Sequence, residues 1–255
     1  AFYRLAQDRA GFSGRLASAF CQGHAGRVGQ NYAILTEGRG SERITDIALR
    51  YYSDDNLHGF GNIEFARADG KPLLEQQRGL VVPLVEKAIE EVRPAQVLEI
   101  GCANGDVLAH LASRHPKIAF VGVDLSVSNA ERKHTFPNLR FVKGYALDLL
   151  RSGQIGGDVV FGNSTFCIFA PKELAAYMDA LKDARQLVIS DPVTWGNEHR
   201  AEPMPYSRHM DLYMWWHNYY GYVSAAGFTI DHFQTVNFAY SYNPGARVVL
   251  ISGHR

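Results

Sequence analysis

The feature that most restricts the fold is a regular alternation of short apolar runs and helical stretches that begins near Gln96. Helical stretches at 106–114 and 171–183 separate the runs, and the second has Leu174, Tyr177, Met178 and Leu181 at helical spacing. Five apolar runs are expected to be strands: 97–100, 118–123, 139–142, 159–162 and 187–190. This alternation predicts βαβ units and a parallel sheet that helices cover on both faces.

The end of the chain follows a different pattern. We expect the aromatic-rich segment 207–226 to be a long helix that stops at Gly227. Two β-rich runs follow, 228–238 and 246–252, and residues 241–245 between them have the composition of a turn. The predicted fold class is therefore α/β, with a doubly wound, mostly parallel seven-stranded sheet that ends in an antiparallel hairpin.

The chain divides near residue 70. Residues 1–70 are rich in Gly and Arg, have weak periodicity, and form a separate N-terminal segment. Residues 71–255 are predicted to form one Rossmann-like domain. It begins with a helix at 73–92, which Pro83 is expected to kink or restart. The apolar face of this helix is expected to contain Leu73, Leu80, Leu84, Ala88 and Val92.

Charge and cysteine content restrict the partners. Lys plus Arg and Asp plus Glu both number 26, so the formal net charge is zero, and no long basic run is present. Nucleic acid and anionic membranes are therefore not expected as partners. No apolar run approaches the roughly 18 residues of a membrane span. Three widely spaced cysteines suit a reducing compartment, so we expect a cytoplasmic protein. The neutral charge favours a small-molecule substrate.

The strongest chemical signal lies at residues 97–106. An apolar strand enters two glycines four residues apart, Gly101 and Gly105, and a helix follows. The glycines let the backbone turn sharply and approach a ligand, and the helix N-terminus presents free N–H groups. A carboxylate at Glu99 would repel a pyrophosphate but favour a cationic amino-acid group. The alternative is a strand–helix turn that binds nothing.

A second acidic residue supports a nucleoside ligand. Asp124 lies 23 residues after Gly101, at the end of the second strand, where it can accept hydrogen bonds from both ribose hydroxyls. Together these stretches resemble class I S-adenosylmethionine-dependent methyltransferases, whose first motif is (Asp/Glu)-x-Gly-x-Gly-x-Gly. Here Ala103 stands at the middle glycine. The resemblance implies S-adenosyl-L-methionine as cofactor and S-adenosyl-L-homocysteine as product. It also implies that residues 1–70 form an N-terminal helical cap that covers the substrate.

The same resemblance assigns further cofactor residues. The family commonly has Gly-Asp-Ala after the third strand, in a segment that lies along the adenine. Here Tyr145 replaces the acid, so Leu147 or a backbone group would contact the adenine amino group. The alternative for Tyr145 is ordinary packing. Asn163 ends the fourth strand beside the methionine part, or else caps a loop. The expected cofactor residues are Glu99, Gly101, Cys102, Ala103, Asn104, Gly105, Asp124, Leu125, Tyr145, Ala146, Leu147, Asn163 and Ser164.

The substrate side is expected after the fifth strand, at 191–226, where aromatic and histidine residues are dense. They would line a pocket, or else form a packing or homodimer surface. His209 and His217 are the candidate catalytic bases, with surface or packing roles as the alternative. On a regular helix they would not share a face, so no metal is expected. The expected pocket residues are Tyr51, Tyr52, Phe166, Asp191, Tyr206, Trp216 and Tyr220.

These features predict methyl transfer from S-adenosylmethionine to O or N of a small, aromatic or apolar metabolite. Three alternatives stay open: a non-catalytic adenosylmethionine-binding subunit, a C-methyltransferase that uses a metal, and methyl transfer to a protein or nucleic acid. An NAD(P)-dependent oxidoreductase fits less well, because the Gly-x-Gly-x-x-Gly spacing is missing and Glu99 would face a pyrophosphate.

Overall fold

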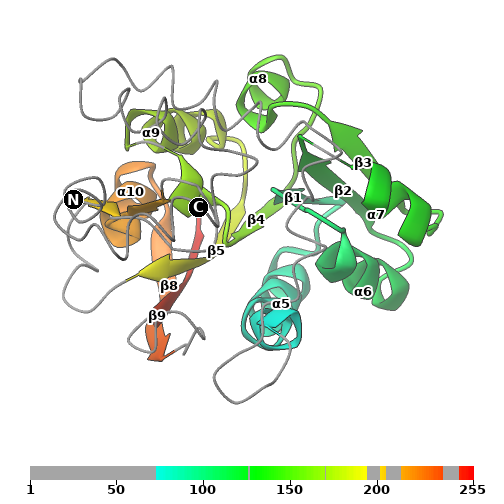
Figure 1. The fold of residues 1–255 in the computed structure, drawn as a ribbon, viewed down its shortest axis with the longest axis horizontal. Helices are drawn as coiled ribbons and strands as arrows, with labels where there is room; N and C mark the ends of the chain where they lie inside the picture. Colours follow the sequence, from blue (N-terminus) through cyan, green and yellow to red (C-terminus); the bar gives the residue numbers. More distant parts are fainter. Residues whose placement is uncertain (1–72, 126, 170, 194–201, 205–213, 238–246) are drawn as a thin grey trace, which may run out of the picture.

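A seven-stranded sheet forms the centre of the chain (Figure 1). The computed structural model describes residues 73–125, 127–169, 171–193, 202–204, 214–237 and 247–255. The strands lie in the order β3-β2-β1-β4-β5-β9-β8. Their bounds are β1 Gln96–Ile100, β2 Ala119–Asp124, β3 Leu139–Lys143, β4 Val159–Asn163, β5 Gln186–Val193, β8 Thr229–Asn237 and β9 Arg247–His254.

Strands β1 to β5 pair in parallel, and β9 runs antiparallel to both β5 and β8. The predicted fold class, including the terminal hairpin, is therefore confirmed. From β1 the chain builds outward to β2 and β3, and then crosses back to β4 on the other side of β1. The carboxyl ends of β1 and β4 flank this switch point, where open α/β sheets bind ligands.

Helices cover both faces of the sheet (Figure 1). Leu98 and Ile100 of β1 point into one core and Val97 into the other, because successive strand residues face opposite sides. One core contains side chains of α8 (Ala146–Arg151), α9 (Pro171–Ala180) and α10 (Tyr219–Ala225). The other contains side chains of α5 (Leu73–Val92) and α6 (Asp106–Arg114), and the short α7 (Ser128–Lys133) contacts β3.

The helix α5 has the predicted bounds and runs unbroken through Pro83, so of the two predicted alternatives, a kink or a restart, the restart is excluded. Its buried face agrees with the prediction only in part, at Ala88 and at the partly buried Leu84 and Val92, which pack against the core. Val81, Val85, Ala88 and Ile89 are buried, whereas Leu80 and Leu84 are only partly buried. Apolar residues surround this part of the helix on nearly all sides, so the sequence pattern could not single out the face that meets the sheet.

The predicted long helix at 207–226 is wrong. Strand β7 (Met214–Trp216) pairs antiparallel with β6 (Glu202–Met204), and α10 begins only at Tyr219. Asn218 starts the helix: its side-chain oxygen accepts a hydrogen bond from the Gly221 N–H at 2.9 Å. The predicted stop at Gly227 is correct. Gly227 adopts a φ of 86°, and the Phe228 N–H donates back to the Val223 carbonyl, as in a Schellman motif.

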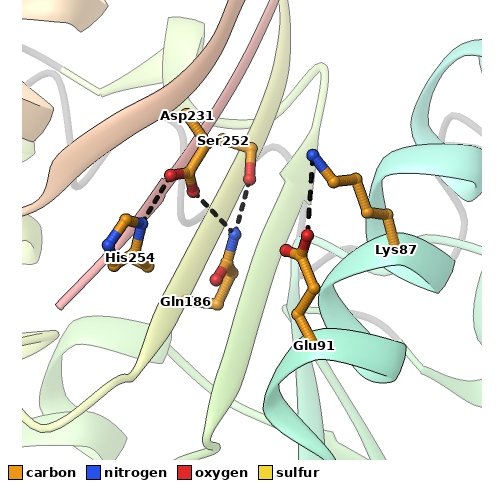
Figure 2. A network of polar contacts seen from close by, with 6 residues as sticks. All are labelled: Lys87, Glu91, Gln186, Asp231, Ser252 and His254. Atoms are coloured by element: carbon orange, nitrogen blue, oxygen red, sulfur yellow. Dashed lines mark hydrogen bonds and ion pairs between the residues drawn. The ribbon is translucent and has the colours of Figure 1, made fainter.

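Polar contacts fasten the last strands to the start of β5 (Figure 2). The Gln186 amide donates to Ser252 Oγ at 2.7 Å and to an oxygen of Asp231, which also pairs with His254. Since Gln186 begins β5, this network lies at the opposite end of the strand from the switch-point edge. The predicted N-terminal cap at 1–70 and the turn at 241–245 lie outside the described residues. Within the part of the chain that is described, no helix is long and apolar enough to cross a membrane.

Candidate functional site

The glycine loop at residues 101–105 connects β1 to α6 at the switch-point edge. The N–H groups of Gly101 and Cys102 both donate to the Val123 carbonyl, at 2.8 and 3.1 Å, so the loop lies against the end of β2. Gly101 and Gly105 have φ angles of 73° and 70°, in the left-handed region that glycine adopts at little cost. Gly105 precedes α6 without a side-chain cap. The loop thus has the backbone geometry that the sequence predicts.

Asp124 ends β2 and orients this loop. Its Oδ2 accepts a hydrogen bond from the Ala103 N–H at 2.8 Å. Ala103 has a φ of 46°, which costs an L-residue with a Cβ roughly 1–2 kcal/mol. The left-handed backbone explains why the family motif has glycine at this place, and the charge-assisted hydrogen bond to Asp124 helps to hold the strained alanine.

Thr165, which no sequence motif singled out, connects the glycine loop to the end of β4. Its hydroxyl lies 3.4 Å from the Gly101 carbonyl and 3.3 Å from the Asn163 carbonyl, and it can donate to either. A Cβ at Gly101 would lie 2.3 Å from Thr165 Oγ1. Gly101 is therefore required by this side chain as well as by its positive φ. The sequence could have pointed to Thr165 only through its position, because Thr165 follows β4 at the switch point.

The site is lined by acidic groups. Glu99 on β1 is buried, and Asp124 lies beside it at the end of the adjacent strand. Burial raises the pKa of the Cys102 thiol well above its usual value, and the charges of Asp124 and Glu99 raise it further. The Asn163 Oδ1 is buried and has no hydrogen-bond donor among the described residues. A carboxylate-lined loop with an unsatisfied acceptor suits a cation with N–H donors better than a phosphate.

The predicted adenine segment is fastened to α9. Ala146 and Leu147 are buried, and the Leu147 N–H donates to the Tyr177 hydroxyl at 3.2 Å. The Tyr145 hydroxyl donates to Glu173, and burial together with this carboxylate raises the Tyr145 pKa. Tyr145 also meets Tyr177 edge to face. These contacts give Tyr145 a packing role, while its contact with adenine stays a prediction.

The remaining predicted cofactor residues lie along the same edge. Asn104 and Leu125 are partly buried. Ser164 has a φ of 55°, and its N–H donates to the Ser190 carbonyl of β5 at 2.7 Å. The loops after β1, β2 and β4 are therefore brought together, as the sequence predicts.

Of the predicted substrate residues, the structure describes the side chains of Phe166, Asp191 and Tyr220. Phe166 and Asp191 are fully buried, and they lie beside each other, with the Phe166 N–H facing the Asp191 carboxyl. Tyr220 is 47% exposed on α10 and packs edge to face against the exposed Phe233 of β8. Trp216 belongs to β7, but its side chain is outside the described part of the structure. Tyr51, Tyr52, Tyr206 and His209 lie outside the described residues.

His217 lies between β7 and α10 and is fully buried. Its Nε2 is 2.9 Å from the Phe169 carbonyl, and because a carbonyl only accepts, Nε2 carries the proton. Burial lowers the pKa of His217 to about 4, so the ring is neutral at neutral pH. It packs edge to face against Tyr219 and Tyr222. These surroundings favour the packing alternative over the catalytic one.

A metal centre finds no support among the residues that the structure describes, which contain no group of three metal-ligating side chains. The combination of Asp191, His209 and His217 is not tested, since His209 lies outside them.

Comparisons with known proteins point to one family. Residues 97–186 match the family model described as a methyltransferase domain. Trans-aconitate 2-methyltransferase of Deinococcus radiodurans is 31% identical over 111 residues, which cover 42% of this chain and 42% of that protein. The chain thus aligns with less than half of the length of this curated relative.

Solved structures share the fold. Magnesium protoporphyrin IX methyltransferase from Synechocystis, with bound S-adenosylhomocysteine, has a TM-score of 0.59 and 16% identity, and the match covers 83% of this chain and 99% of that one. The 1,6-didemethyltoxoflavin-N1-methyltransferase of Burkholderia thailandensis, also with S-adenosylhomocysteine, has a TM-score of 0.54 and 17% identity, over 72% and 81% of the two chains. At these identities the likeness establishes the fold alone.

Proposed function

We propose that this chain is a class I S-adenosylmethionine-dependent methyltransferase, which transfers a methyl group from S-adenosylmethionine to a small molecule. The observation that carries the proposal is the pairing of a glycine loop with two carboxylates, Glu99 and Asp124, at the switch point of the sheet. This arrangement favours a ligand with a cationic amino-acid end and a ribose, and it disfavours the pyrophosphate of a dinucleotide.

The residues present fit the cofactor. Asp124 is placed to accept hydrogen bonds from ribose hydroxyls, while the buried Glu99 and the unsatisfied Asn163 oxygen suit the ammonium group. Gly101 and Gly105 let the loop adopt its positive φ angles, and the space of their missing Cβ atoms is taken by Thr165 and Phe141. When bound, S-adenosylmethionine supplies a methyl group that its sulfonium has already activated for displacement.

The protein must then hold the acceptor, exclude water and, for a hydroxyl acceptor, remove a proton. Of the two candidate bases, we propose that His209 acts and His217 does not. His217 is fully buried, its Nε2 proton is directed to Phe169, and its pKa of about 4 makes it a weak base.

Replacing each histidine by Gln separates these roles. His209→Gln should lower kcat by about 100-fold or more, as expected for a lost general base, and should remove the acidic limb of the pH–rate profile. His217→Gln keeps a donor for the Phe169 carbonyl, so kcat should fall less than about tenfold and the acidic limb should persist. Loss of that limb in the His217 variant alone would reverse the assignment.

Substitution of Asp124 tests the cofactor site. Asp124→Ala should weaken S-adenosylhomocysteine binding by about 1–3 kcal/mol, because charge-assisted hydrogen bonds to the ribose are lost. Asp124→Asn can still accept a hydrogen bond from the Ala103 N–H but lacks the charge. Its affinity for S-adenosylhomocysteine should therefore lie between those of Asp124→Ala and the unmodified protein. Isothermal titration calorimetry measures all three proteins. Asp183→Ala, at an exposed aspartate in the turn after α9, is the matched control. Unchanged affinity in a folded Asp124→Ala protein would contradict the proposed site.

For the acceptor, we propose O or N of a small aromatic or apolar metabolite. The names of the relatives above describe proteins that act on small molecules: trans-aconitate, 1,6-didemethyltoxoflavin and magnesium protoporphyrin IX. A screen with labelled S-adenosylmethionine should therefore begin with aromatic hydroxy and amino metabolites and add small carboxylic acids. Transfer of label to any of them distinguishes an enzyme from a non-catalytic binding subunit.

A further inference from the structure

A buried carboxyl that the proposed reaction does not use lies behind the end of β4. Asp191 is the residue of β5 that follows Ser190, and Ser190 pairs with Asn163 at the end of β4. The side chain is fully buried. Burying an ionisable group is costly, and such a group is retained where its neighbours make use of it.

Four donors face the Asp191 carboxyl. They are the backbone N–H groups of Thr165 and Phe166, the Cys167 thiol of the short 3-10 helix η2 (Phe166–Ile168), and the Tyr219 hydroxyl of α10. Burial raises the pKa of Asp191 to about 8, although all four donors lower it. The pKa values of Cys167 and Tyr219 are both raised well above their usual ranges, so these two groups stay neutral when Asp191 titrates.

We expect the contacts of Asp191 to respond to its charge. Among the described residues, no donor meets the geometry of a well-aligned hydrogen bond to either of its oxygens. Long or bent contacts of this kind strengthen when the carboxyl becomes an anion, because charge-assisted hydrogen bonds are shorter and stronger than neutral ones. The two N–H groups belong to the turn that leaves β4, so that turn is expected to move with the charge of Asp191.

This turn is connected to the glycine loop by one side chain. The Thr165 hydroxyl reaches the carbonyls of Gly101 and Asn163, and Gly101 has no side chain that would hold Thr165 away. The connection therefore runs from Asp191 on β5, through the Thr165 N–H, to the loop after β1.

We propose that Asp191 is a positioning residue, which holds the turn at Thr165 and thereby sets the spacing between the glycine loop and the end of β4. The proposal rests on the proposed function, since the cofactor would lie between these two segments. Asp191 acts through Thr165 and touches neither the cofactor nor the substrate.

The link itself can be tested without any ligand. In nuclear magnetic resonance spectra of the full chain, the Thr165 and Phe166 amide signals should shift together with a midpoint near pH 8. Asp191→Asn has almost the same size but does not titrate, so it should abolish this shared transition. The amide of Gly156, a glycine with nothing near its Cβ position, serves as reference. Persistence of the transition in Asp191→Asn, or its absence from the unmodified protein, would overturn the proposal.

The consequence for the cofactor is measured by S-adenosylhomocysteine affinity. Thr165→Val keeps the shape but removes the hydroxyl, and should weaken binding about five- to tenfold, whereas Thr165→Ser should restore it. Asp191→Asn should bind like the unmodified protein at pH 7, but without the change in affinity that the unmodified protein undergoes between pH 7 and 9. Equal affinity of Thr165→Val and the unmodified protein would overturn the positioning role.

The two proposals fail in different ways. If the amide transition depends on Asp191 but the unmodified protein does not bind S-adenosylhomocysteine, the proposed function is wrong and the link between Asp191 and the turn stands. If the unmodified protein binds it but no transition occurs, the proposed function stands and the positioning role is wrong.

Discussion

Asp191→Asn is expected to stabilise the protein increasingly as the pH rises from about 4 to 8. The pKa of Asp191 is raised from 3.8 to about 8 by burial. Within this window Asp191 is ionised in the unfolded chain but protonated in the folded chain. The free energy of unfolding of the unmodified protein therefore falls as the pH rises. Asn does not titrate, and the difference between the two proteins should grow by about 1.4 kcal/mol per pH unit.

Urea denaturation at pH 5, 6, 7 and 8 measures this difference in the free energy of unfolding. His217, whose lowered pKa also makes stability depend on pH below about 6.5, is present in both proteins and cancels. The same substitution at the exposed Asp183 should leave the difference small and independent of pH. A difference between Asp191→Asn and the unmodified protein that stays constant from pH 5 to 8 would mean that Asp191 is ionised in the folded state.

Gly101→Ala is expected to destabilise the protein by about 2–4 kcal/mol and to impair cofactor binding. Two costs combine. The backbone at Gly101 has a φ of 73°, which disfavours any residue with a Cβ, and the new Cβ would lie 2.3 Å from Thr165 Oγ1. Moving Thr165 away would break the contact between the glycine loop and the turn after β4.

Two other glycines separate these costs. Gly153 has a φ of 69°, and a Cβ added there would have nothing within 4 Å, so Gly153→Ala measures the backbone cost alone. Gly156 has open space and no positive φ, so Gly156→Ala should change stability by less than about 0.5 kcal/mol. A double-mutant cycle with Thr165→Ala should recover part of the loss at Gly101. Equal effects of Gly101→Ala and Gly153→Ala would rule out the predicted clash.

Local patterns predicted the sheet and the position of the glycine loop. Apolar runs between turn residues located β1 to β5 to within a few residues, since strands buried on both faces have a distinct composition. The glycine loop and Asp124 could be identified because each follows a strand of a parallel sheet, and the carboxyl ends of adjacent parallel strands lie at the same edge. The observed strand order confirms the predicted sheet, and the hydrogen bond between the Ala103 N–H and Asp124 confirms that the glycine loop meets the end of β2.

Tertiary contacts explain what could not be predicted. Trp215 and Trp216 suit a helix or a strand equally by apolar character, and the pairing of β7 with β6 depends on a segment ten or more residues away. Thr165 and Asp191 could not be linked from the sequence, because their meeting requires the register of β4 with β5. His217 was a reasonable base on residue type alone, but burial, which the sequence does not reveal, lowers its pKa.

The central claim is that the acid-lined glycine loop binds S-adenosylmethionine. Calorimetric titration of the full chain with S-adenosylhomocysteine tests it most directly, with NAD and NADP as parallel ligands under the same conditions. We expect micromolar binding of S-adenosylhomocysteine, equivalent to about 8 kcal/mol, and no measurable binding of either nicotinamide nucleotide. Preferential binding of NAD or NADP, or no binding of S-adenosylhomocysteine by folded protein, would contradict the claim.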